Sequence, residues 1–113
     1  MTVVANQPAR QLSPADMAER AGEVAAMLKT LAHPVRLQLA CTLAQGEHAV
    51  GELEGMLDIH QPTLSQQLTV LREAGIVKTR REGKQIFYML TAEKAARLIE
   101  ALYAIYCAPA ELP

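Results

Sequence analysis

Apolar residues recur every three or four positions over much of the first 75 residues, which is the spacing of one face of an α-helix. Capping residues, prolines and glycines divide this pattern into four predicted helices. The first begins at Ser13, the second runs from His33 to Gly46, and the third covers residues 50–57. The fourth opens at Pro62 and ends at Gly75. The first two helices carry the apolar positions Met17, Ala21, Val24 and Leu28, then Leu37, Cys41 and Ala44, with Leu39 and Leu43 beside them.

After Gly75 the chain changes to a pattern typical of two short strands. β-Branched and aromatic residues flank Glu82-Gly83, where a tight turn favours glycine, so residues 76–81 and 84–90 predict a β-hairpin. Thr91 can cap a last helix, which ends before Pro109. The apolar stripe of this helix consists of Ala95, Leu98, Leu102 and Ile105, broadened by Ile99 and Tyr106.

These elements predict a mainly α-helical fold with a β-hairpin, in the order four helices, two strands and one helix. Residues 50–57 and 62–75 form two short helices joined by a tight turn, which predicts a helix-turn-helix with the hairpin as its wing. We expect residues 13–108 to form one winged helix-turn-helix domain. Residues 1–12 are expected to form a flexible N-terminal tail and residues 109–113 a C-terminal tail.

Composition narrows the class of protein. The chain has 113 residues, half of them apolar and 4% aromatic, so its core depends on aliphatic side chains. No apolar run approaches the roughly 20 residues of a membrane helix, and residues 1–12 lack the features of a secretory signal. Two cysteines do not indicate a secreted disulfide scaffold. We therefore expect a cytoplasmic protein that does not associate with membranes and needs no cofactor.

The distribution of charge favours DNA as a partner. The net charge of −1 argues weakly against nucleic acid, but the hairpin carries four positive charges against one negative charge, a local net charge of +3. The helix over residues 62–75 has a polar face of amides and hydroxyls, which can bond to base edges or phosphates. Glu73 beside Arg72 suggests an ion pair, so Arg72 ranks below Gln66 and Ser65 as a DNA contact. The predicted DNA-binding residues are Gln61, Thr63, Ser65, Gln66, Gln67, Thr69, Arg72, Lys78, Arg80, Arg81 and Lys84.

Two stretches of the chain resemble a known family of DNA-binding proteins. Residues 31–37, Leu-Ala-His-Pro-Val-Arg-Leu, are similar to the opening signature of the ArsR/SmtB family of bacterial winged-helix repressors, and residues 65–90 resemble its recognition helix and wing. The resemblance implies a repressor that forms a homodimer through its first and last helices and binds an inverted-repeat operator in double-stranded DNA. Gln67 departs from the pattern, because the family often has histidine at this position, and this leaves the base preference open.

Members of this family commonly respond to metals, but this sequence offers few metal ligands. The segment that carries paired cysteines in many metal sensors has none here, and the last helix has no histidine. His33, His48 and His60 are scattered, which is a poor basis for a tetrahedral site, so we expect no metal and give these histidines capping or surface roles.

The two cysteines are more informative as a pair than singly. Taken alone, Cys41 is typical of an inert core residue and Cys107 has no activating charge nearby. In this fold the last helix returns along the first two, so the two thiols can face each other within one subunit. The pair resembles that of the dithiol, sulfide-responsive branch of the family. This leads to the hypothesis of a repressor that releases DNA when a disulfide or polysulfide links Cys41 to Cys107, in response to persulfide or another oxidant.

Three alternative functions remain open. The first is a metal- or metalloid-responsive repressor of the same family. The second is a thiol oxidoreductase, but the sequence lacks a Cys-x-x-Cys pair and a glycine-rich phosphate loop, so we expect no enzyme. The third is an adaptor that uses a winged helix for protein contacts, which would not bind duplex DNA with a steep salt dependence.

Overall fold

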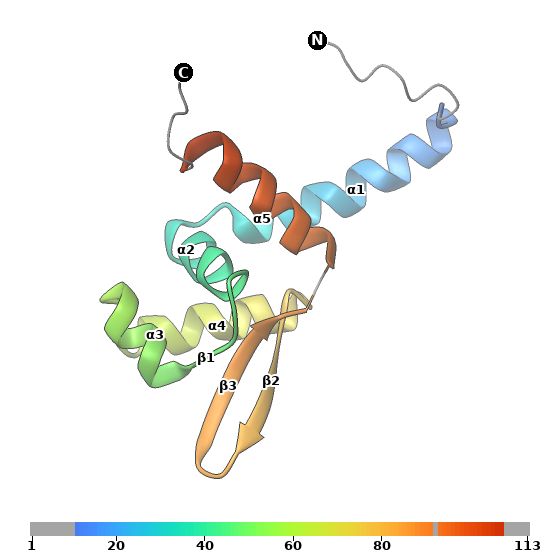
Figure 1. Ribbon diagram of the computed structural model, residues 1–113. Helices are drawn as coiled ribbons and strands as arrows, with labels where there is room; N and C mark the ends of the chain where they lie inside the picture. The colour runs from blue at the N-terminus through green and yellow to red at the C-terminus, as the bar shows by residue number, and fades with distance from the viewer. Residues whose placement is uncertain (1–10, 92, 108–113) are drawn as a thin grey trace, which may run out of the picture.

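The computed structural model describes residues 11–91 and 93–107. Figure 1 shows two helices, α1 and α5, at one end of the molecule, while a β-hairpin projects from the other end. The predicted terminal tails lie almost wholly outside the described residues. The described elements, in chain order, are α1 (Pro14–Leu31), α2 (Pro34–Leu43), β1 (His48–Ala49), α3 (Val50–Leu57), α4 (Thr63–Glu73), β2 (Val77–Glu82), β3 (Gln85–Leu90) and α5 (Glu93–Tyr106).

The helix starts follow from local capping, as the sequence predicted. The Ser13 hydroxyl oxygen accepts a hydrogen bond from the Asp16 backbone N–H at 3.1 Å, and Pro14 occupies the first turn of α1. His33 caps α2 in the same way, because its Nδ1 atom accepts a hydrogen bond from the Val35 N–H at 3.2 Å. The capping role expected for this histidine is therefore confirmed.

The core is built mainly from leucines of α2, α3 and α4. The predicted inward positions of α4 are confirmed, since Leu64, Leu68 and Leu71 are fully buried. Gly75 follows α4 with a φ of 77°, a left-handed conformation that favours glycine at a helix end. The helix-turn-helix thus rests on a continuous apolar layer.

The buried face of α2 differs from the prediction. In α2 the buried residues are Leu39, Ala40 and Leu43, whereas Ala44 is exposed. The reason is that α2 contacts α1, α4, α5 and β3, so several of its sides are covered and no single stripe faces the core. The stripe of α1 is exposed in the protomer, where Leu31 is the one buried residue of this helix.

The hairpin belongs to a three-stranded antiparallel sheet of order β1-β3-β2. Strands β2 and β3 pair from Val77↔Leu90 to Glu82↔Gln85, which confirms the predicted hairpin, and Gly83 in its turn has a φ of 65°. The short strand β1 pairs with β3 and was not predicted. Two residues are too few to show an alternating pattern, so this strand leaves no signal in the sequence.

The helix-turn-helix α3-α4 followed by the β2–β3 wing makes this a winged helix-turn-helix fold. The element order confirms the predicted architecture, with β1 as the addition. Among the helices in the described ranges, none combines the length and apolar character that a membrane crossing requires.

Candidate nucleic-acid interface and thiol pair

The Gln61 side chain, just ahead of α4, forms hydrogen bonds with the first turn of this helix. Its side-chain oxygen accepts hydrogen bonds from the Ser65 backbone N–H at 3.1 Å and from the Ser65 hydroxyl at 2.6 Å. A helix start leaves several N–H groups without intrahelical acceptors, and this side chain satisfies one of them. Gln61 thus supports the start of α4 through its side-chain oxygen, and its amide N–H groups make no hydrogen bond within the described residues.

Some polar side chains on the exposed face of α4 form hydrogen bonds within the protein, and others do not. The Thr69 hydroxyl donates to the Ser65 carbonyl oxygen at 2.9 Å, so it is turned back onto its own helix. Thr63 and Gln66 are exposed and make no side-chain hydrogen bond within the described residues. Arg72 is also exposed, and the suggested ion pair with Glu73 is not formed in the described part of the chain. The polar face predicted from the sequence is confirmed. On it, Thr63, Gln66 and Arg72 have side chains without a hydrogen bond or ion pair in the described part of the chain.

Gln67 differs from the other polar residues of α4. It is half-buried, and its side-chain oxygen accepts a hydrogen bond from the Arg36 Nη1 atom at 2.8 Å. The sequence predicts Gln67 to be a DNA-binding residue and gives no signal for a role of Arg36. The link between them joins positions 31 residues apart, which no local pattern reveals.

Arg80 in the wing is held by two carboxylates. Its guanidinium donates to Glu47 through Nε at 2.9 Å and Nη2 at 2.7 Å, and to Glu82 through Nη1 at 2.9 Å. It also lies over the Phe87 ring, 4.5 Å from the ring centroid, across the β2–β3 pair. These hydrogen bonds lower the pKa of the Glu47 carboxyl and raise the pKa of Arg80. Arg80 therefore fastens the wing to the segment before β1.

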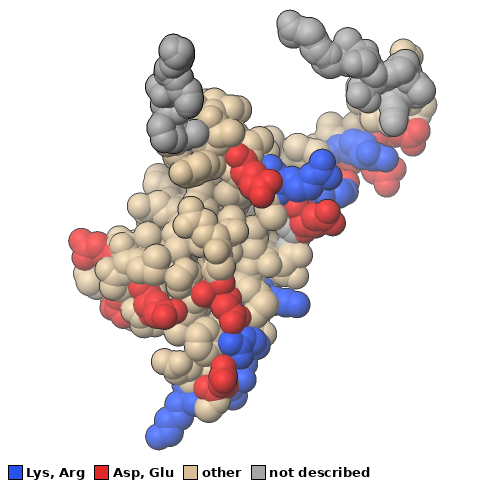
Figure 2. All heavy atoms as spheres, viewed as in Figure 1, with Lys and Arg blue, Asp and Glu red and all other residues tan. Residues whose placement is uncertain are grey.

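The other basic residues of the wing point into solvent. Lys78, Arg81 and Lys84 are exposed, and no carboxylate of the described ranges forms an ion pair with them. Figure 2 shows basic side chains along the projecting wing. With Glu47 included, the wing has four positive and two negative charges, so the local net charge falls from the predicted +3 to +2.

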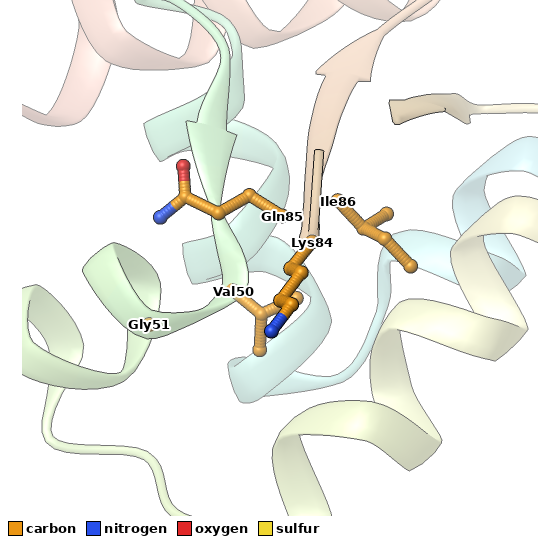
Figure 3. Close-up of a pocket in the computed structure, with 5 residues that line it drawn as sticks. All are labelled: Val50, Gly51, Lys84, Gln85 and Ile86. Carbon is orange, nitrogen blue, oxygen red and sulfur yellow. The ribbon is translucent and has the colours of Figure 1, made fainter. Parts of the chain in front are cut away.

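A shallow hollow lies between the start of α3 and the wing, lined by Val50, Gly51, Lys84, Gln85 and Ile86. Figure 3 shows the Lys84 side chain beside that of Val50, with its amino group at the free end. Lys84 is the one titratable residue in this lining. The hollow thus places one of the wing's four positive charges beside the start of α3.

The two cysteines lie outside α4 and the wing, one on α2 and the other just past the end of α5. Cys41 is half-buried on α2, Cys107 is exposed directly after α5, and both are free. A hollow of about 200 Å³ separates the two helices beside Cys41, and Tyr103, one helical turn before Cys107, also lines it. Partial burial raises the pKa of the Cys41 thiol, and the charge of Cys107 raises it further.

The exposure of the two thiols and the raised pKa of Cys41 predict which thiol reacts first. Because thiolate is the nucleophile, we expect limiting iodoacetamide at neutral pH to label Cys107 before Cys41. The labelling of Cys41 should accelerate as the pH rises, because more of its thiol ionises. Peptide mass spectrometry at several times measures both rates, and denatured protein, in which both sites are open, is the control. Equal rates in the folded protein would contradict this order.

The histidines are distributed over the surface of the described chain. His48 lies 3.4 Å from Glu52, and His60 lies 2.9 Å from Asp58 and 3.4 Å from Glu54. Hydrogen bonds with Glu54 and then Asp58 raise the pKa of His60. Within the described residues, no group of three or more His, Cys, Asp or Glu side chains is arranged to hold a metal ion.

Comparison with known proteins places this arrangement in a family. The profile of the bacterial regulatory proteins of the arsR family matches residues 33–79. The biofilm growth-associated repressor of Agrobacterium fabrum is 78% identical over 95 residues, which cover 84% of this chain and 81% of that protein. The crystal structure of the transcriptional repressor BigR from Xylella fastidiosa superposes with a TM-score of 0.80 at 64% identity, covering 87% of this chain and all of that one.

A more distant solved structure extends the comparison. A homodimeric winged helix-turn-helix DNA-binding domain from Mycobacterium bovis superposes with a TM-score of 0.69 at 34% identity, covering 86% of this chain and 88% of that chain. The agreement thus reaches from the sequence signature to the arrangement of helices and wing. By its sequence and its fold, this chain belongs to the arsR family of bacterial regulatory proteins.

Proposed function

We propose that this protein is a dimeric transcriptional repressor whose binding to operator DNA is abolished when Cys41 and Cys107 of each subunit become covalently linked. The observation that supports this switch is the position of the two cysteines. Cys41 lines the hollow between α2 and α5, and Cys107 follows α5 one helical turn after Tyr103, which lines the same hollow. The charge of Cys107 also raises the pKa of Cys41. The surface of α4 and the wing contains no cysteine, so control must come from outside it.

DNA binding is supported by the shape and chemistry of α4 and the wing. An α-helix fits the major groove, where amides and hydroxyls such as those of Gln66 and Thr63 can bond to base edges. Lys78, Arg81 and Lys84 of the wing, which form no ion pair with the part of the chain that the structure describes, are suited to phosphates. Two such units related by two-fold symmetry would read an inverted repeat, with half-sites about 34 Å apart.

Dimer formation is supported by apolar side chains that the protomer leaves uncovered on α1 and α5. Val24 on α1 is 51% exposed, and Ile105 and Tyr106 on α5 are 69% and 80% exposed. The two helices lie together at the end of the molecule opposite the wing (Figure 1). A second copy covering this face would remove it from water and leave both α4 helices free for DNA.

The role of the wing can be measured through the salt dependence of binding. We expect Arg81→Gln to reduce the slope of log affinity against log salt by about 1.8, because each of two protomers loses one phosphate contact worth about 0.9. Arg81→Lys retains the charge and should retain the slope. Titrations of duplex DNA between low and moderate salt give both values. An unchanged slope for Arg81→Gln would remove Arg81 from the interface.

A low-molecular-weight persulfide can serve as the oxidant that links the two cysteines. The thiolate of one cysteine attacks the outer sulfur of the persulfide, which gives a cysteine persulfide and a free thiol. The second cysteine then attacks the inner sulfur, forms the disulfide and releases sulfide. Two cysteines lose two electrons in total, and the persulfide accepts them. If a second persulfide first extends the chain by one sulfur atom, the second cysteine attacks the middle sulfur, expels the terminal sulfur as sulfide and forms a trisulfide.

The energy available from such a link is sufficient for a switch. Joining Cys41 to Cys107 closes a loop of more than sixty residues, which the chain-entropy model values at about 4 kcal/mol of restriction on the unfolded chain. Only part of this free energy can act on the conformation of the folded protein. Allosteric couplings of about 1 to 3 kcal/mol change affinity roughly 5 to 150-fold. A fraction of the loop energy, used to re-angle α5 against α2, would therefore release the DNA.

Reductant and chelator distinguish this function from that of a metal-responsive repressor. We propose to treat DNA-bound protein with a persulfide until it dissociates, and then to add either dithiothreitol or a metal chelator. If the thiol link is the switch, dithiothreitol restores DNA binding and the chelator does not. Restoration by the chelator alone would favour metal control and would refute the dithiol mechanism.

A further inference from the structure

Arg36 joins three helices through one side chain. It lies in the first turn of α2 and is half-buried. Its Nε atom donates to the Thr30 carbonyl oxygen in the last turn of α1 at 2.6 Å. Its Nη1 atom donates to the Gln67 side-chain oxygen on α4 at 2.8 Å. The recognition helix is therefore hydrogen-bonded, through a single rigid guanidinium, to the end of α1.

Both acceptors suit a structural role for this arginine. The Thr30 carbonyl is one of the last in α1, where a helix has no further N–H groups to offer and where a cation is favourable. The planar guanidinium holds its donors in fixed directions, so two bonds to two helices restrict their relative orientation. A lysine at this position would lack that rigidity.

The same contact limits what Gln67 can do at a base edge. Reading adenine with a glutamine requires the amide to donate and accept at once. The Gln67 oxygen already accepts from Arg36, so the amide is not arranged for that bidentate contact. Its neighbour Gln66 is exposed and makes no such bond in the described chain. Two adjacent glutamines thus have different surroundings.

We propose that Arg36 is a positioning residue, which through Thr30 and Gln67 fixes the orientation of α4 relative to α1. The inference rests on the proposed dimer, in which α1 belongs to the interface. Because α1 would then be fixed relative to its counterpart, Arg36 sets the separation of the two recognition helices. Gln67 acts through Arg36, and base preference belongs to residues such as Gln66.

The test uses matched glutamine variants and a DNA duplex selected from a random library by the wild-type protein. Gln67→Met and Arg36→Met each remove the link, and the double variant completes a mutant cycle. Gln66→Met is the control for loss of an exposed amide. Gln67→Glu retains the acceptor, and thermal unfolding establishes that every variant is folded. Affinities are measured for the selected duplex, for duplexes with single base-pair changes, and for one with an extra base pair between the half-sites.

We expect Gln67→Met and Arg36→Met to weaken binding to the selected duplex by a similar factor, and the double variant to be no weaker than the weaker single variant. Both should reduce the penalty for the extra base pair, because α4 is less firmly oriented, while preferences among single base-pair changes stay the same. Gln67→Glu should retain the wild-type spacing penalty. Gln66→Met should instead relax preference at one base pair.

Two results would overturn the inference, and they differ from failure of the proposed function. Independent effects in the mutant cycle would show that Arg36 and Gln67 do not act together. Relaxed preference at one base pair in Gln67→Met, without the same change in Arg36→Met, would make Gln67 a base-reading residue. If the wild-type protein selects no duplex at all, the proposed function itself fails.

Discussion

Cys41→Ser combined with Cys107→Ser gives a repressor that binds its operator as tightly as the reduced wild-type protein and stays bound when a persulfide is added. The two substitutions remove both atoms of the proposed link and leave α4 and the wing unchanged. For the wild-type protein, persulfide should lower the affinity about 5 to 150-fold, the range of typical allosteric couplings. Fluorescence anisotropy of labelled operator, before and after persulfide, measures the effect in both proteins.

Single serine variants separate the link from simple modification of one thiol. Cys41→Ser still carries the exposed Cys107, which can become a persulfide but has no partner in the same subunit. We expect this variant to stay on DNA although its mass increases. Release of the double variant by persulfide would mean that the signal acts elsewhere in the protein, and the dithiol mechanism would be wrong.

Val24→Glu on α1 should dissociate the dimer and lower operator affinity by about 100-fold or more, because the second half-site no longer binds in an intramolecular step. Val24 is half exposed in the protomer, so the substitution leaves the folded protomer intact. In the dimer the carboxylate would be buried without a designed partner, which costs several kcal/mol. Sedimentation equilibrium measures the association, and the operator titration measures the affinity.

Met56→Glu is the matched control for this substitution. Met56 is 56% exposed on α3, away from the proposed interface, so the same charge there should leave the protein dimeric. The control isolates position from the general effect of adding a carboxylate to an apolar surface residue. A Val24→Glu protein that still sediments as a dimer would exclude this part of α1 from the interface.

The parts of the fold that the sequence predicted are those with a local signal. Leu64, Leu68 and Leu71 recur at helical spacing, and the structure buries all three. Glu82-Gly83 between β-branched and aromatic residues predicted the wing, and the observed register agrees. A helix or strand and its buried face depend mainly on residues close together in the chain. The spacing of apolar residues therefore predicts them.

The parts that the sequence missed depend on partners far apart in the chain. Arg80 remains a predicted DNA contact, but its hydrogen bonds to Glu47, 33 positions earlier, leave no local signal in the sequence. Gln67 bonds to Arg36 across 31 positions, and no periodicity connects them. The face that α2 buries likewise depends on how many neighbours surround it. The sequence predicts which residues are candidate DNA contacts from their chemical type. Only the structure shows which of these side chains already form hydrogen bonds or ion pairs within the protein.

The most direct test of the dithiol switch is the intact mass of protein that leaves DNA compared with protein that stays. A persulfide-treated sample, half released from immobilised operator, is separated into bound and free fractions, and each is weighed by mass spectrometry without reductant. We expect the free fraction to carry the Cys41–Cys107 link, as a loss of two hydrogens with or without added sulfur atoms, and the bound fraction to carry unlinked thiols. A linked species in the bound fraction, or an unmodified protein in the free fraction, would contradict the proposed switch.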